Sequence, residues 1–230
     1  MDYQLVRTDS GTRRSSWLLY GGLLGPVLFT LVYLIEGATR PGYDPWRQTI
    51  SALSLSDQGW MQIGNFLVSG LLILGFAAGL LLVWPHGKGA TWGPLLIAVV
   101  GVGLILAGVF VTDPALGYPP GTPPGPAATT TLHGTIHFIG GAISVFAGLP
   151  AACIVLARRF AGDPAWRGWA AYSLGTAVVM VGCFVAFAVM ASGSGPGGLF
   201  ERLSLSVGLV WVALLAIRLL RPGAALTTRP

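Results

Sequence analysis

Six long stretches without a charged side chain constrain the fold more than any other feature of this sequence. Residues 15–35, 58–87, 89–112, 114–157, 168–200 and 203–217 contain no Asp, Glu, Lys or Arg. A helix of about 20 apolar residues crosses the roughly 30 Å of hydrocarbon in a bilayer. Five stretches reach that length, and the last reaches it when Arg218 extends its side chain toward the headgroups. The sequence therefore predicts an all-α, polytopic membrane protein.

Composition agrees with this fold class. The chain is 53% hydrophobic and 9% charged, whereas soluble domains are about 25% charged. We expect one domain at 17–220, a bundle of six transmembrane helices near 17–36, 62–84, 92–112, 132–157, 168–191 and 200–220. Residues 1–16 are polar and predict a disordered cytoplasmic segment, and 221–230 predict a cytoplasmic tail. The first apolar run is too long for a signal peptide, so it is expected to remain as an anchor.

The basic residues predict the orientation. Of the 13 Lys and Arg residues, Arg40, Arg47 and Arg202 alone fall in outer loops if the N-terminus is inside, and the other ten fall in cytoplasmic segments. Lys and Arg concentrate on the cytoplasmic side of membrane proteins, so both termini are expected in the cytoplasm, with the protein in the cell membrane. The net charge of +5 is explained by residues that flank helices on an anionic leaflet. We therefore expect the lipid bilayer to be the partner of these basic residues, and we expect no nucleic acid to bind.

The first outer loop has a distinctive sequence, RPGYDPWRQTISALS, over residues 40–54. Asp44 precedes a proline and is suited to cap a short helix over residues 45–55. In such a helix Trp46, Ile50 and Leu53 share one face. The pattern predicts an amphipathic helix that lies along the outer membrane interface.

Two histidines four residues apart begin the fourth predicted span. His133 and His137 would lie on one face of the helix, and the positive end of the helix dipole favours their neutral form. Neutral imidazoles can bind a metal or accept a proton. A divalent metal such as zinc could be held by His133, His137 and Asp113, the residue that ends the third span. The alternative is that the histidines bond loop carbonyls and headgroups, while Asp113 only caps a turn before Pro114.

The remaining acidic groups also fall at the outer end. Glu36, in the last turn of the first helix, either faces the headgroups or donates a proton in a cavity. Glu201 and Arg202 are expected to form a solvated pair. Since no ionisable side chain occupies the middle of the bundle, an ion or proton pathway is disfavoured and an outward-facing pocket is favoured. The candidate catalytic residues are Glu36, Asp44, Asp113, His133 and His137.

Three motifs together carry a family resemblance. They are P-G-Y-D-P-x-R-Q-x-I-S-x-L after the first helix, D-P after the third, and H-G-x-x-H at the start of the fourth. The motifs resemble those of a bacterial multi-pass membrane family that is catalogued only as a domain of unknown function. The resemblance covers most of the chain and implies no particular activity.

Three functions remain open. The first is an enzyme that acts on a lipid-like or isoprenoid molecule by acid–base or metal-assisted chemistry. The H-x-x-x-H helix with an Asp resembles the zinc hydrolases that include alkaline ceramidases and adiponectin receptors, although their pair lies on the last of seven helices and this pair lies on the fourth of six. The second is a terpene cyclase that a protonated carboxylic acid initiates. The third is a non-catalytic accessory or sensing protein.

Overall fold

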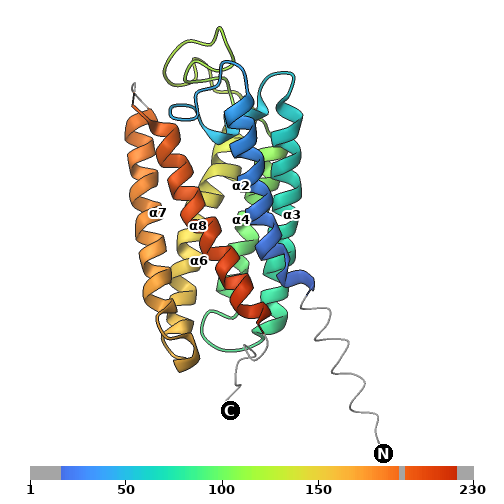
Figure 1. Ribbon diagram of the computed structural model, residues 1–230, viewed down its shortest axis with the longest axis vertical. Helices are drawn as coiled ribbons and strands as arrows, with labels where there is room; N and C mark the ends of the chain where they lie inside the picture. The colour runs from blue at the N-terminus through green and yellow to red at the C-terminus, as the bar shows by residue number, and fades with distance from the viewer. Residues whose placement is uncertain (1–16, 192–194, 222–230) are drawn as a thin grey trace, which may run out of the picture.

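The predicted six-helix architecture is confirmed in the computed structural model, which describes residues 17–191 and 195–221 (Figure 1). Six helical spans are long and apolar enough to cross a membrane, and the described residues contain no strand. Five of the spans hold one long helix each, and the fourth joins α5, the π-helix η2 and α6. The elements are α2 (Gly21–Thr39), α3 (Gly59–Val83), α4 (Trp92–Val109), α5 (Leu132–Ile136), η2 (His137–Ile143), α6 (Ser144–Phe160), α7 (Trp169–Ala191) and α8 (Gly197–Leu220). The predicted segment 1–16 and the tail after residue 221 lie outside the described residues.

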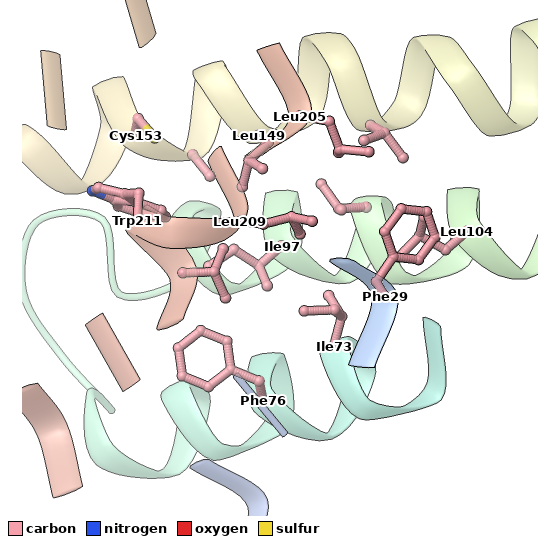
Figure 2. Packing of buried hydrophobic residues seen from close by; sticks show 14 of the residues in the cluster. Phe29, Ile73, Phe76, Ile97, Leu104, Leu149, Cys153, Leu205, Leu209 and Trp211 are labelled. Atoms are coloured by element: carbon pink, nitrogen blue, oxygen red, sulfur yellow. The ribbon is translucent and has the colours of Figure 1, made fainter. Parts of the chain in front are cut away.

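Helices that are adjacent in the chain also pack side by side. Contacts run from α2 to α3, α4, α6, α7 and α8, and α8 returns to α2, so the spans form a closed ring. The ring is filled by buried apolar side chains such as Phe29, Ile73, Ile97, Leu149 and Leu209, which come from five different helices (Figure 2). The described part of the bundle therefore has one apolar core.

The two ends of the bundle differ. Residues 40–58 and 110–131 form long connections at one end, named here the loop-rich end (Figure 1). The first span begins and α8 ends at the opposite end, where the connections are shorter (Figure 1). The polar residues singled out in the sequence therefore gather at the loop-rich end.

The first loop contains a short helix, as expected, but its place differs from the prediction. A turn occupies residues 45–47, and the 3₁₀ helix η1 (Ile50–Ser54) follows. Ile50 is 2% exposed and Trp46 is 60% exposed, so these two side chains do not share one face as predicted, and Ile50 packs into the bundle. The reason is tertiary: the carbonyls of Trp46 and Arg47 accept hydrogen bonds from Leu199 and Gly198 at the start of α8. Those carbonyls are then not used in a local helix.

Backbone contact joins α3 to α4. A Cβ atom added to Gly70 would lie 2.7 Å from the carbonyl oxygen of Gly101, and one added to Gly101 would lie 2.9 Å from that of Gly70. Contacts below 3.0 Å force the backbones apart. Small residues permit such close approach of helices in lipid, where packing replaces the hydrophobic effect as the driving force.

We predict that Gly70→Ala lowers the free energy of unfolding by about 1–3 kcal/mol, because the added methyl overpacks the α3–α4 contact. The matched control is Gly64→Ala in the same helix, where an added Cβ meets nothing within 4 Å. Thermal unfolding of both variants in detergent measures the difference. Equal melting temperatures for the two variants would contradict the assignment of this contact.

Candidate functional site

A buried arginine fixes the first loop onto the bundle. The Arg40 guanidinium donates to Glu36 Oε1 at 2.9 Å, and the two side chains are only 3% and 4% exposed. The other acceptors of Arg40 are the carbonyl oxygens of Leu53, Leu55 and Gln58 and the hydroxyl of Ser56. Glu36 therefore neutralises the arginine that holds residues 53–58 in place, which gives this candidate catalytic residue a structural partner.

A second arginine fixes the same loop from α8. Arg202 donates to Gln48 O and Gly198 O, each at 2.9 Å, and to the phenol oxygen of Tyr43. Its guanidinium lies 5.6 Å from the centre of the Tyr43 ring, within the range of a cation–π contact. The Tyr43 hydroxyl donates to the carbonyl of Thr49 at 2.8 Å, and burial raises the pKa of this phenol further above neutral pH.

The prediction of a solvated Glu201–Arg202 pair is wrong. Glu201 is 7% exposed, and its Oε2 accepts a 2.7 Å hydrogen bond from the backbone N–H of Ile50. No ion pair joins Glu201 to Arg202 among the residues that the structure describes. The two neighbours instead bond the first loop at positions two residues apart, Arg202 at the carbonyl of Gln48 and Glu201 at the N–H of Ile50.

The two long loops form one cover over the bundle. Asp44 Oδ1 accepts from Trp46 N at 2.9 Å and shapes the turn, and the Asp44 N–H donates to Gln48 Oε1. Gln48 Nε2 reaches across to Leu116 O, and the buried Tyr118 ring packs edge-on against Tyr43 at 5.4 Å. We call residues 40–58 and 110–131 together the cover. Asp44, a candidate catalytic residue, is placed in this cover as a turn-forming side chain.

Asp113 bonds the N-cap residue of α5, and His133 lies in the first turn of that helix. Asp113 accepts hydrogen bonds from the N–H and the hydroxyl of Thr131, and the Thr131 hydroxyl accepts from Gly134 N at 3.0 Å. A Cβ on Gly134 would lie 1.9 Å from Asp113 Oδ2, so the glycine of H-G-x-x-H leaves room for the carboxylate. His133 is exposed, and its ring packs edge-on against Phe110 at 5.4 Å.

His137 is buried one turn deeper. Its Nδ1 lies 2.9 Å from Phe110 O and 3.3 Å from Ala107 O. A carbonyl oxygen can only accept, so Nδ1 carries the proton and, in the neutral ring, Nε2 keeps its lone pair. The π-helix η2 begins at this residue, and such turns occur often at functional sites. The local structure thus holds a basic nitrogen in a fixed orientation.

A small cavity brings His137 and Glu201 to the same space beneath the cover. Its volume, counted as positions open to the centre of a water molecule, is about 40 Å³, which accommodates a few waters. Ser51 is the other polar lining residue. The apolar lining residues are Phe29, Ile50, Phe66, Leu104, Ala107, Gly141, Ala142, Val145, Phe146 and Leu205. A histidine from the fourth span and a glutamate from the sixth therefore line one mostly apolar cavity.

Of the five candidate catalytic residues, His137 alone lines this cavity. The three predicted zinc ligands are engaged separately, since Asp113 bonds Thr131, His137 bonds backbone carbonyls and His133 is exposed. Among residues 17–191 and 195–221 no group of three His, Cys, Asp or Glu side chains could hold a metal ion. The arrangement offers a proton acceptor and a carboxyl group, which are the components of acid–base chemistry.

Sequence reasoning missed Glu201 as a site residue. The available signal was helical spacing, because Glu201, Ser204, Leu205 and Gly208 recur at i, i+3, i+4 and i+7 in an apolar helix. All four are buried on one face of α8. A carboxyl on the same face as a serine and a glycine points into the bundle and not toward lipid.

We predict that Glu201→Ala lowers the free energy of unfolding by about 1–3 kcal/mol, because it leaves the buried Ile50 N–H without an acceptor. Glu201→Gln is the control, since its amide oxygen can still accept that hydrogen bond. Thermal unfolding in detergent compares the two. If both variants melt at the wild-type temperature, the Ile50–Glu201 bond does not hold the cover.

Comparison with known proteins identifies the family. The sequence matches the family model described as a protein of unknown function (DUF998) over residues 23–218, which is most of the chain. Neither the curated proteins nor the solved structures give a match. The match confirms the prediction that the chain belongs to a membrane family of unknown function. With six apolar spans and this match, the chain belongs to the DUF998 family, as a multi-pass membrane protein of unknown function.

Proposed function

We propose that this protein is a membrane enzyme that acts on a lipid-like or isoprenoid substrate by acid–base chemistry, with His137 and Glu201 as the proton-transferring pair. The observation that carries the proposal is that these two side chains line one otherwise apolar cavity. Apolar walls suit a hydrocarbon substrate, and paired groups that can take and give a proton suit catalysis.

The two residues have distinct roles in this proposal. His137 accepts a proton at Nε2, because its Nδ1–H is held by the carbonyls of Phe110 and Ala107. Glu201 is held at Oε2 by Ile50 N, and among the described residues no hydrogen bond occupies its Oε1. That oxygen is the atom available to exchange a proton with substrate.

The other candidate residues support the site in this proposal. Glu36 and Asp44 shape the cover, and Asp113 fixes the start of α5, one turn before His137. The metal-assisted version, with His133, His137 and Asp113 as zinc ligands, has less support because each predicted ligand has a different set of neighbours. The acid–base version requires no movement of these three side chains toward one another.

The test is turnover of a total lipid extract from the source cells by protein reconstituted in vesicles, followed by mass spectrometry. His137→Asn and Glu201→Gln should each reduce product formation on the order of 10² to 10⁴-fold, the usual contribution of a positioned acid or base. Both changes preserve polar groups at the buried positions. His133→Asn, at the exposed histidine of the same motif, is the matched control and should retain wild-type turnover.

The pattern of losses separates the chemistries. A cyclase that a carboxylic acid initiates requires Glu201 as its acid and yields an isomeric cyclic product, whereas His137→Asn then has a smaller effect. Loss in His133→Asn equal to that in His137→Asn would instead favour the metal-assisted version. Wild-type turnover in both the His137 and Glu201 variants would overturn the catalytic assignment of this cavity.

The second candidate is a non-catalytic accessory or sensing protein. The observation in its favour is the cavity volume of about 40 Å³, which holds a few waters and not a lipid. Catalysis on a lipid therefore requires the cover to move. If the wild-type protein leaves every lipid in the extract unchanged, the accessory function is favoured.

We also propose that both termini face the cytoplasm and that the cover faces outward. The first span begins and α8 ends at the same end of the bundle (Figure 1). Of the nine basic residues in the described part of the chain, six lie in segments at that end, namely Lys88, Arg158, Arg159, Arg167, Arg218 and Arg221. This asymmetry is typical of cytoplasmic segments.

Reporter fusions test this orientation. Alkaline phosphatase fused after Arg221 should be inactive, and a fluorescent protein at the same position should fluoresce, because each folds on one side of the membrane only. A phosphatase inserted after Gly121, at a turn of the cover, is the reciprocal control and should be active. Active phosphatase after Arg221 would reverse the proposed topology.

A further inference from the structure

A basic pocket lies at the end of the bundle opposite the cover. It is bounded by the start of α7 and the last turns of α8, whose ends stand apart there (Figure 1). Its volume, counted as positions open to the centre of a water molecule, is about 420 Å³, roughly ten times that of the cavity beneath the cover. The acid–base chemistry proposed at the loop-rich end does not involve it.

Three arginines line this pocket. Arg167 precedes α7, Arg218 lies in the last turn of α8, and Arg221 follows that helix. No acidic residue is among the lining residues in the described part of the chain. Among the described residues the one ion pair is Glu36–Arg40, at the other end of the bundle. The pocket therefore carries positive charge that no carboxylate of the described chain neutralises by direct contact.

Arg218 is held in place as part of the pocket wall. Its Nη2 donates to Ala165 O at 2.7 Å, and its guanidinium lies 5.5 Å from the centre of the Trp166 ring. Its Nε is buried, and no described residue accepts a hydrogen bond from it. Arg167 and Arg221 are exposed, with no side-chain hydrogen bond to the described residues, so their donors are available to a ligand.

The rest of the lining is suited to a lipid. Trp169, Tyr172, Leu214 and Ile217 place aromatic and aliphatic surface beside the arginines. Trp and Tyr concentrate at the level of lipid headgroups, and the apolar side chains continue into the spans of α7 and α8. A ligand with a charged head and an apolar tail matches both parts of the wall.

We propose that this pocket binds the phosphate-bearing headgroup of an anionic phospholipid, with Arg167, Arg218 and Arg221 on the phosphate and the acyl chains along α7 and α8. Guanidinium groups bind phosphate oxygens through paired, charge-assisted hydrogen bonds. Basic pockets between transmembrane helices recognise anionic headgroups in this manner. Free phosphate shares the headgroup chemistry but makes no use of the apolar wall.

The experiment is native mass spectrometry of the full-length, delipidated protein in detergent, titrated with phosphatidylglycerol. One lipid should bind, more tightly than phosphatidylcholine of the same acyl chains. The Arg167→Gln/Arg221→Gln variant should bind phosphatidylglycerol about tenfold or more weakly, because each basic residue near an anionic lipid contributes on the order of 1 kcal/mol. Arg167→Lys/Arg221→Lys should restore only part of the affinity, because lysine keeps the positive charge but cannot form the paired hydrogen bonds of a guanidinium.

The matched control is Lys88→Gln/Arg158→Gln, which removes two exposed charges at the same end of the bundle but outside the pocket. It should leave the affinity within about twofold of wild type, because neither residue lines the pocket and salt weakens the effect of exposed charges that do not contact the ligand. Equal weakening by control and pocket variants would overturn the proposal in favour of a general surface charge effect. Wild-type affinity in the pocket variant would overturn it outright.

Competition with inorganic phosphate tests whether the pocket binds a lipid headgroup or a soluble phosphate compound. Phosphate should displace phosphatidylglycerol no better than sodium chloride of the same ionic strength, because it gains nothing from the apolar wall. Specific displacement by phosphate alone would reassign the pocket to a soluble phosphate compound. Circular dichroism and elution volume of each variant verify that the bundle is intact before binding is compared.

Discussion

A guanidinium removed from water has to be surrounded by acceptors, and Arg40 shows how this requirement shapes the loop-rich end. Charged groups in an apolar setting are costly unless they are paired and hydrogen-bonded. Arg40 meets the requirement with one carboxylate and the oxygens of residues 53–58. The same bonds give an irregular loop the backbone partners that a helix would otherwise supply. Arg202, in α8, likewise donates a hydrogen bond to the backbone carbonyl of Gln48.

The membrane part of the fold was predictable because a helix in lipid satisfies its own backbone. Length and the absence of charge are then sufficient to locate a span. The histidine spacing was informative as well, since both histidine rings contact Phe110. His133 packs against the Phe110 ring, and His137 hydrogen-bonds the Phe110 carbonyl. The four-residue spacing corresponds to a rise of about 6 Å along the helix. That difference in depth leaves His133 exposed and His137 buried.

Partners that lie far apart in the chain were not predictable from local pattern. Asp44 before a proline indicated a helix, but the following carbonyls bond to α8, about 150 residues later. Glu201 beside Arg202 suggested a solvated pair, yet their partners are Ile50 and Gln48. Two charged residues that are adjacent in the sequence do not reveal their tertiary hydrogen-bond partners. The sequence therefore identified His137 as a site residue but not Glu201.

The carboxylate of Asp113 sits where a side chain on Gly134 would be, and this fixes the register of two spans. Sliding α5 by one residue along α4 would shift His137 by about 1.5 Å and bring a bulkier residue against the carboxylate. The bonds from His137 Nδ1 to Ala107 and Phe110 would then no longer be in reach. Asp113 and Gly134, which are not among the residues lining the cavity, therefore determine where its imidazole stands. Variation at either position alters the chamber from a distance, without a change in any residue that lines it.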